Sequence, residues 1–574
     1  MQIKSYYIKS IVAAVGMTCL LDVSASGGWP LVFCGLFLVC FKRDILAEKR
    51  MLCCVNVCAF IFACFSVLVK VEEYVTSEFY VPGVVKIFLC FMACYWFYQR
   101  CLLKIYIWFE QCENKVFCNS LVKNKSFFWI VFGSVLLVWI PYYLAFYPAV
   151  MSFDSLEQAK QMLGVSPYSN HHPMLHTLSL KMIYSIAKNF VVSEIAAFGI
   201  ICAVQMILLA LVFSLTIYWA YQKGIKRSIL ALVWAFYALL PYQGLHSVTL
   251  WKDVWFAGVV LVFVLMIFIY YYNYPKEKKG KILLHVLITL LGCGVCLMRS
   301  NGYYAFLVFL IIIGVCEYKK SKYFILSLGL AFAAATLIKG PVYDKFNIIP
   351  GDIVEELSIP IQNIGFVVVE GKELTTEEYE LLSNVVNVEE IPNHYKKNIS
   401  DPLKLLIRFE DNLEYLEENK VEYLKLWIKL GMRYPLSYLI SWVNQTAGYW
   451  HPEYTQKVHF TKLSDNELGI SRKSSVLEDM MEKWINGWIE VPLLGSLFCM
   501  GTYIWALFLI SGYVIYRKKW DVLKIYSLAF GIWFTLLIAS PTAYSFRYLY
   551  AVIVSIPLLI MMAFVNYKEA EDAR

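Results

Sequence analysis

Apolar runs long enough to cross a membrane recur along almost the whole chain, and short polar segments separate them. A helix needs about 20 apolar residues to span a hydrocarbon core of roughly 30 Å, and inside lipid a helix satisfies its own backbone hydrogen bonds. The pattern therefore predicts an all-α polytopic membrane protein with about 14 transmembrane helices. The predicted spans lie near residues 10–22, 28–41, 51–69, 83–98, 127–147, 191–219, 228–242, 254–272, 282–298, 303–317, 323–338, 491–515, 525–540 and 548–566.

The first two runs are short, which leaves open whether both of them cross the membrane. The first run follows Lys4 and Lys9, as the apolar part of a signal peptide does. No clear small-residue cleavage site follows it, so we expect an uncleaved first helix.

Lys and Arg are distributed unevenly over the connecting segments. Alternate segments, such as 42–50, 276–281 and 517–524, are rich in them, whereas the short segments between carry one or none. The positive-inside rule places the rich segments in the cytoplasm. We therefore expect a multi-pass protein of the plasma (cytoplasmic) membrane, with both termini cytoplasmic and with segments 148–190 and 339–490 on the extracytoplasmic face.

Composition narrows the class of protein further. The chain of 574 residues is 60% hydrophobic and only 16% charged, against roughly 25% charged residues in an average soluble domain. These values exclude a soluble enzyme and a nucleic-acid-binding domain. Residues 339–490 differ from the rest, since they carry 16 Lys/Arg and 25 Asp/Glu.

That contrast predicts four parts along the chain. They are an N-terminal four-span module over 1–126, a membrane core over 127–338 with its outer loop 148–190, a mostly helical extracytoplasmic domain over 339–490, and a C-terminal three-span segment over 491–574. Within the extracytoplasmic domain, the helical spacing of Leu residues after Pro402 predicts a helical hairpin or one long amphipathic helix.

Four polar clusters stand at predicted outer ends of spans, far apart in the sequence but expected in one plane. Charged residues at such depths need a specific reason. The candidates are Asp154, Glu157, His171 and His172 in the segment after span 127–147, Lys252 and Asp253 before span 254–272, Arg299 after span 282–298, and Arg547 before the last span.

Each cluster also has a purely structural interpretation. Asp154 suits a helix N-cap, Lys252 beside Trp251 suits an interfacial anchor, and either arginine suits snorkelling to lipid headgroups. Taken together, the clusters predict an outward-facing pocket in which one carboxylate is surrounded by cations. Such a carboxylate can act as a base toward an acceptor hydroxyl, while the cations stabilise a departing phosphate.

At these residues the sequence resembles the GT-C-type membrane glycosyltransferases, and more narrowly an uncharacterised bacterial branch of that superfamily. The matching segments run in order over about 127–566: YPAVMSFDS with NHHPMLHT, LWKD, MRSNGYY, IPIQNIG with ELTTEE, YPLSYLISWVNQTAGYWHPEY, and SFRYLY. The resemblance implies a GT-C-like fold, a polyprenyl-phosphate-linked sugar as donor, and an outer-face active site with an acidic residue in the first large outer loop. That residue is Asp154 here.

The sequence departs from the pattern of these relatives at one position. Many of them carry two adjacent acidic residues, whereas Ser155 follows Asp154 here, so a second carboxylate is left to Glu157 or Asp253. A carboxylate pair would suit Mg²⁺ or Mn²⁺, and His171 and His172 are further candidate ligands. No clear metal-ligand spacing is present, so no cofactor is certain.

We expect an inverting sugar transfer to a cell-envelope glycan, with Asp154 as general base. Lys252, Arg299 and Arg547 would bind the donor phosphate. The residues expected to position substrates are His171, His172, Glu157, Asp253 and Trp450, the last with its neighbours His451 and Tyr454.

Two other classes of function stay open. A polytopic transporter or a lipid-linked-sugar flippase would also have many spans, but ionisable residues at mid-span are few and polar residues concentrate on one side. A non-catalytic assembly scaffold would tolerate the substitution Asp154→Asn.

Overall fold

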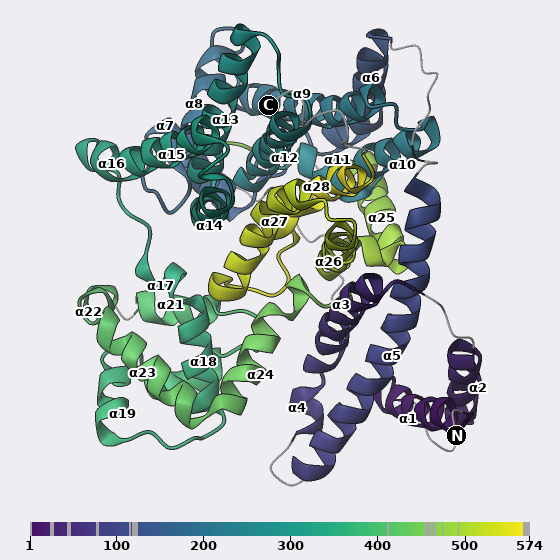
Figure 1. The fold of residues 1–574 in the computed structure, drawn as a ribbon. Helices are drawn as coiled ribbons and strands as arrows, with labels where there is room; N and C mark the ends of the chain where they lie inside the picture. The colour runs from purple at the N-terminus through teal and green to yellow at the C-terminus, as the bar shows by residue number, and fades with distance from the viewer. Residues whose placement is uncertain are drawn as a thin grey trace.

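The computed structural model describes residues 3–22, 28–42, 47–75, 80–113, 116, 124–409, 412–453, 461, 463, 466–472, 475–491 and 493–565. In these residues every named element is a helix, and strand pairing is limited to isolated bridges. Figure 1 shows a membrane body, the N-terminal helices and a lobe of residues 353–446 as neighbouring parts.

Ten helices within the described residues are long and apolar enough to cross a membrane. The pair α10 (Arg227–Ala238) and α11 (Pro241–Ser247), bent by 54°, adds an eleventh if it counts as one broken span. Three further predicted spans are apolar helices of fewer than 18 residues, at Tyr6–Leu20, Trp29–Phe41 and Met500–Tyr516. The chain is therefore a multi-pass, all-α membrane protein, as predicted, while the number 14 stays a prediction.

The N-terminal helices dock on the body through α3 (Lys49–Leu68) and α5 (Tyr80–Glu113), and from α5 Tyr106 Oη donates to Leu509 O at 2.9 Å. Phe62 stacks on the Trp505 ring with centroids 4.4 Å apart. The last of these helices is 34 residues and therefore about 51 Å long, well beyond the predicted span 83–98. The others are α1 (Ile3–Leu20), α2 (Trp29–Lys42) and α4 (Val71–Tyr74).

The core supplies most of the spans and two short helices of the predicted outer loop. These are α6 (Ser126–Ala145), α7 (Phe153–Leu163), α8 (Met174–Ala187), α9 (Glu194–Gln222), α12 (Lys252–Tyr272), α13 (Lys278–Met298), α14 (Ser300–Glu317) and α15 (Lys322–Leu337). α8 exposes Leu178, Met182 and Ile186 along one side. This face suits a helix lying along a membrane surface.

The predicted span 228–242 is not one helix. α10 ends at Ala238, and Pro241 begins α11 after a break. Proline has no backbone N–H and clashes with the preceding turn, so a helix does not continue through it undisturbed. All seven residues of α11 are buried.

The lobe has a hydrophobic core of its own, from Val354 to Leu430. The prediction of a hairpin or a single long helix after Pro402 is wrong, because this stretch forms three helices. Asn419, a weak helix former, separates the second of these helices from the third. The helices from the body into the lobe are α16 (Tyr343–Lys345), α17 (Ile353–Glu356), α18 (Ser358–Val369), α19 (Thr376–Ser383), α20 (Ile391–His394), α21 (Asp401–Phe409), α22 (Leu413–Glu418), α23 (Lys420–Arg433) and α24 (Pro435–Thr446).

The C-terminal helices return to the body. They are α25 (Val476–Glu490), α26 (Met500–Tyr516), α27 (Trp520–Ala539) and α28 (Phe546–Phe564). α25 belongs to the predicted domain 339–490, yet it lies on α6, where Trp484 Nε1 donates to Tyr142 Oη at 3.2 Å. α28 is the most buried of the ten spans, and it carries Arg547 in its first turn.

Candidate functional site

The chain around Asp154 is held against the chain before Lys252. Val150 O accepts a hydrogen bond from Leu250 N at 3.0 Å, and Ser155 Oγ donates to Leu250 O at 2.8 Å. These bonds join residues about a hundred positions apart. They place the first turn of α7 beside the first turn of α12.

Gln205 on α9 holds the same segment from the interior of the body. Its side-chain amide donates to the carbonyls of His246, Ser247 and Thr249 at 3.2, 3.1 and 2.7 Å. Its Oε1 accepts from Trp255 Nε1 at 2.9 Å. Buried carbonyls that leave helix geometry need such donors, so Gln205 stabilises the irregular turn that presents Lys252.

Asp154 lies at the centre of the predicted cation cluster. Its Oδ2 accepts from Arg547 Nη1 at 2.8 Å and lies 3.8 Å from Lys252 Nζ. Lys252 Nζ in turn donates to His172 Nδ1 at 3.0 Å. The Asp154 side chain is 26% exposed, so ligand or water can reach it.

The N-cap interpretation of Asp154 is wrong. Ser152 occupies the N-cap position of α7, and Asp154 is the second residue of the helix. A carboxylate in the first helical turn is favoured by the helix dipole. Its side chain nevertheless faces the two cations, so it belongs to the cluster.

A second ion pair stands beside the first. Arg299 donates to Asp253 Oδ1, and the Asp253 side chain is fully buried. The ring of Tyr548 joins the two pairs, because the Cζ atoms of Arg299 and Arg547 lie 4.8 and 5.1 Å from its centroid. Cations are attracted to aromatic faces at such distances, so the ring keeps both guanidinium groups in one place.

Electrostatics hold the Asp154 carboxyl ionised. Burial by itself raises its pKa, but Lys252 and Arg547 outweigh burial and hold the pKa well below its ordinary value. In this state the carboxylate is a weak base. Its basicity depends on whether the two cations stay with it.

His172 is neutral in this environment. Burial lowers the pKa of its ring to about 2, and the nearby Lys252 ammonium acts in the same direction. His171 is exposed, and the two rings meet edge to face with centroids 4.7 Å apart. His172 therefore orients Lys252 as a hydrogen-bond acceptor, while His171 faces outward beside it.

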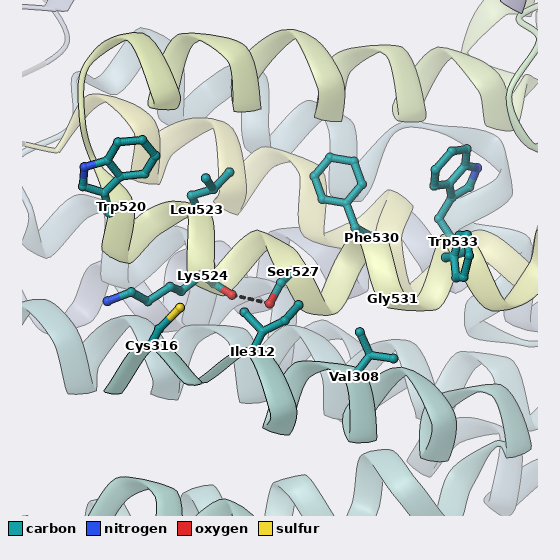
Figure 2. A pocket seen from close by; sticks show the side chains of 11 residues that line it. Val308, Ile312, Cys316, Trp520, Leu523, Lys524, Ser527, Phe530, Gly531 and Trp533 are labelled. Carbon is teal, nitrogen blue, oxygen red and sulfur yellow. Dashed lines mark hydrogen bonds between the residues drawn. The ribbon is translucent and has the colours of Figure 1, made fainter. Parts of the chain in front are cut away.

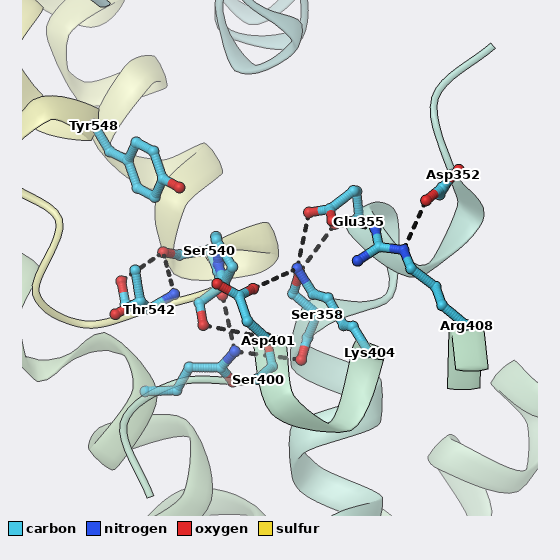
Figure 3. Close-up of polar contacts among 12 residues, drawn as sticks. Asp352, Glu355, Ser358, Ser400, Asp401, Lys404, Arg408, Ser540, Thr542 and Tyr548 are labelled. Carbon is cyan, nitrogen blue, oxygen red and sulfur yellow. Dashed lines mark hydrogen bonds and ion pairs between the residues drawn. The ribbon is translucent and has the colours of Figure 1, made fainter. Parts of the chain in front are cut away.

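The lobe borders the site. Asn170 N, next to the histidines, donates at 2.7 Å to Ile349 O in the segment that leads into the lobe, and within the lobe Ser400 N donates at 2.8 Å to Pro541 O before α28. Figure 3 shows Tyr548 facing this part of the lobe, with Asp401 close by.

An ion network stabilises that edge of the lobe (Figure 3). Lys404 is fully buried and lies 2.8 Å from Glu355 and 3.3 Å from Asp401. Arg408 pairs with Glu355 and Asp352, each at 2.7 Å. Burial raises the pKa of Glu355, but Lys404 and Arg408 outweigh it and lower the pKa to about 2.

Two predicted site residues are not brought into the cluster. Glu157, one turn after Asp154, makes no ion pair or side-chain hydrogen bond with any described residue. Trp450 is 1% exposed and lies among Phe65 and Trp442. An interior ring cannot stack on a sugar without rearrangement, which argues against a substrate-positioning role, and Tyr454 lies outside the described residues.

Three residues that organise the cluster were not among the predicted ones. The Tyr548 ring contacts Arg299 and Arg547. Arg547 Cζ lies 5.0 Å from the centroid of the Trp251 ring. Gln205 donates a hydrogen bond to the turn before Lys252. Trp251 and Tyr548 are sequence neighbours of the predicted residues Lys252 and Arg547, and this proximity could have identified them. Gln205 stands alone in an apolar span, where a polar residue is itself a signal.

No group of three or more His, Cys, Asp or Glu side chains that could hold a metal ion occurs among the described residues. The cluster offers cations and only two carboxylates, each already paired with a cation. The Mg²⁺ or Mn²⁺ considered from the sequence thus has no assembled ligand set there and stays an untested prediction.

Comparison with known proteins gives one match. No curated protein and no solved structure matches the chain. A family model described as a family of unknown function, DUF6020, matches residues 165–574. The match covers most of the chain, including Lys252, Arg299 and Arg547, and begins after Asp154. The chain belongs to the DUF6020 family.

Proposed function

We propose that the protein is a membrane glycosyltransferase that moves a sugar from a polyprenyl-phosphate donor to a cell-envelope glycan on the extracytoplasmic face. One observation carries the proposal: the Asp154 carboxylate contacts Arg547 and Lys252 beside a third cation, Arg299. Three cations against the carboxylates of Asp154 and Asp253 leave one positive charge in excess. A phosphodiester with one negative charge matches that excess.

The arrangement suggests how the base is activated. A donor phosphate that enters the cluster competes with Asp154 for Arg547 and Lys252. Because burial alone raises the Asp154 pKa, loss of the two cations and arrival of a negative phosphate both make the carboxylate more basic. The base is therefore strong only when the donor is bound.

The reaction balances with these groups. The acceptor hydroxyl oxygen attacks the anomeric carbon, and Asp154 takes its proton. The bond from that carbon to the phosphate oxygen breaks, and the polyprenyl phosphate leaves with the electron pair. Arg547, Arg299 and Lys252 stabilise the charge that develops on the phosphate, and Arg binds two of its oxygens at once.

The test compares cells with no copy of the gene, with the wild type and with Asp154→Asn at matched membrane levels. Mass spectrometry of the surface polymers is expected to show loss of one sugar in both the null and the Asp154→Asn cells. Glu157→Gln, one turn away and outside the cluster, is the matched control and is expected to keep that sugar.

Two outcomes would contradict the proposal. If Asp154→Asn keeps the sugar that the null loses, Asp154 is not the base and transport becomes the better hypothesis. If substrate moves across sealed vesicles without covalent transfer, the protein is a carrier.

A further inference from the structure

A membrane-facing groove of about 760 Å³ runs between α14 and α27 (Figure 2). Its walls are apolar, with Val308 and Ile312 on α14 and with Leu523, Phe530 and Phe534 on α27. From Trp520 to Phe534 it follows α27 for about 20 Å. Pockets of this size and lining bind apolar ligands, and at this depth the available apolar ligand is a lipid chain.

The polar side chains of the groove lie at one end. Lys524, Ser527 and the half-exposed Trp520 line the end where α14 finishes and α27 begins (Figure 2). Tryptophan is enriched at membrane–water interfaces. An amphiphile in the groove therefore has its headgroup at this end. The Asp154 cluster lies at the other end of the same helices, because α14 begins directly after Arg299.

The polar end has an excess of positive charge. Lys524 is paired with Glu317 and Asp521. Three more lysines flank this end and are exposed, and in the part of the chain that the structure describes they make no ion pair. They are Lys319 and Lys320 after α14 and Lys518 before α27.

We propose that this groove binds an acyl chain of an anionic phospholipid, whose phosphate lies among Lys319, Lys320 and Lys518. Basic pockets between transmembrane helices on the cytoplasmic side bind anionic lipid headgroups in this way. The lipid occupies the leaflet opposite to the proposed transfer site. The proposal is independent of the proposed function, since it concerns neither the donor nor Asp154.

The experiment uses the purified full-length protein in nanodiscs of phosphatidylcholine with or without phosphatidylglycerol. Native mass spectrometry counts retained lipids, and thermal unfolding reports stabilisation by bound lipid. The wild type is expected to retain one phosphatidylglycerol selectively and to unfold at a higher temperature in its presence. Ile312→Trp, which fills the groove, is expected to abolish both effects. The matched control is Ile311→Trp, because the neighbouring Ile311 is 56% exposed and lies outside the groove.

A second variant keeps the test independent of core packing. K319Q/K320Q/K518Q changes exposed residues only and is expected to weaken phosphatidylglycerol binding at least about ten-fold, without changing retention of phosphatidylcholine. Equal retention of the two lipids by the wild type would overturn the proposal. So would unchanged selectivity in the triple variant, or an Ile312→Trp protein that still binds phosphatidylglycerol like the wild type.

Discussion

Arg547 contacts both a carboxylate and two aromatic rings in the candidate site. It donates to Asp154 at 2.8 Å and lies over the rings of Trp251 and Tyr548. A lysine could replace its charge but not its planar fork or its stacking on aromatic faces. The geometry at this residue therefore argues for a role that needs an arginine.

Arg547→Lys is expected to lower sugar transfer by about ten- to a hundred-fold, because one bidentate contact to the developing phosphate charge is lost. The measurement is transfer in isolated membranes at matched protein levels. Arg517→Lys, at the end of α26, is the control and should transfer at the wild-type rate. A wild-type rate for Arg547→Lys would remove Arg547 from the phosphate site.

We expect the Asp253–Arg299 ion pair to contribute to the stability of the folded protein. Asp253→Leu leaves Arg299, whose side chain is 12% exposed, without its carboxylate, and breaking a buried pair typically costs about 3–5 kcal/mol. Asp253→Leu/Arg299→Leu removes both charges and should regain most of the lost stability while staying inactive. Thermal unfolding of the purified proteins measures this, and a double variant no more stable than the single one would contradict it.

At the scale of elements, the bent helix pair α10–α11 builds the site. α11 turns by 54° from α10 after the break at Pro241, and it ends at Ser247, so the carbonyls near His246 lie at its C-terminal end and outside regular helix geometry. Gln205 on α9 supplies their donors. One amide side chain therefore links an ordinary membrane helix to the position of Lys252.

Gln205→Leu is expected to lower stability by about 1–3 kcal/mol, because buried carbonyls and the Trp255 indole lose their partner. Transfer activity should fall as well, since the turn before Lys252 loosens. The control is Ser214→Ala on the same helix, whose hydroxyl donates to Ala210 O within α9. Unfolding temperature and transfer rate are the two readouts, and unchanged values of both would disprove the role of Gln205.

At the scale of the whole molecule, the lobe is attached on two sides. Its ion network lies beside Tyr548, and at its other side Phe366 and Ile440 share an apolar cluster with Val71 of α4. The N-terminal helices and the site therefore both contact the lobe. The ion pairs of the network join residues within the lobe, so acid removes contacts inside the lobe.

The Glu355 network predicts a dependence of stability on pH. The pKa of Glu355 is lowered from 4.5 to about 2 in the folded protein, so its contribution is complete above pH 4.5 and is lost as the pH falls toward 2. Because the side chain is 37% exposed, screening limits the effect to on the order of 1 kcal/mol. Glu355→Gln should lower stability at pH 7 by that amount and flatten the decline below pH 4.5. Thermal unfolding across that range measures both effects, and an unchanged pH profile would contradict the prediction.

Several site residues were predictable from the sequence because each stands next to an apolar run. Asp154, Lys252, Arg299 and Arg547 follow or precede spans on the side that is poor in Lys and Arg. Glu157 was chosen because it lies one turn after Asp154, and Trp450 because an aromatic face suits a sugar ring; the fold leaves both outside the cluster. Packing decides which side of a helix faces the cluster and how deeply an aromatic ring is buried, and distance along the sequence does not report packing.

The sequence by itself determined the class of structure. Hydrocarbon admits only segments that satisfy their own backbone, so long apolar runs must be helices; ten of them are long enough to span. Tertiary structure alone decided which polar groups meet. Asp154 and Arg547 are 393 positions apart, and only the packing of α7, α12 and α28 brings them to 2.8 Å. The inward place of Trp450 and the ion network of the lobe have the same origin, because each depends on contacts between distant segments that no local pattern encodes. The break before α11 differs, because Pro241 marks it in the sequence itself.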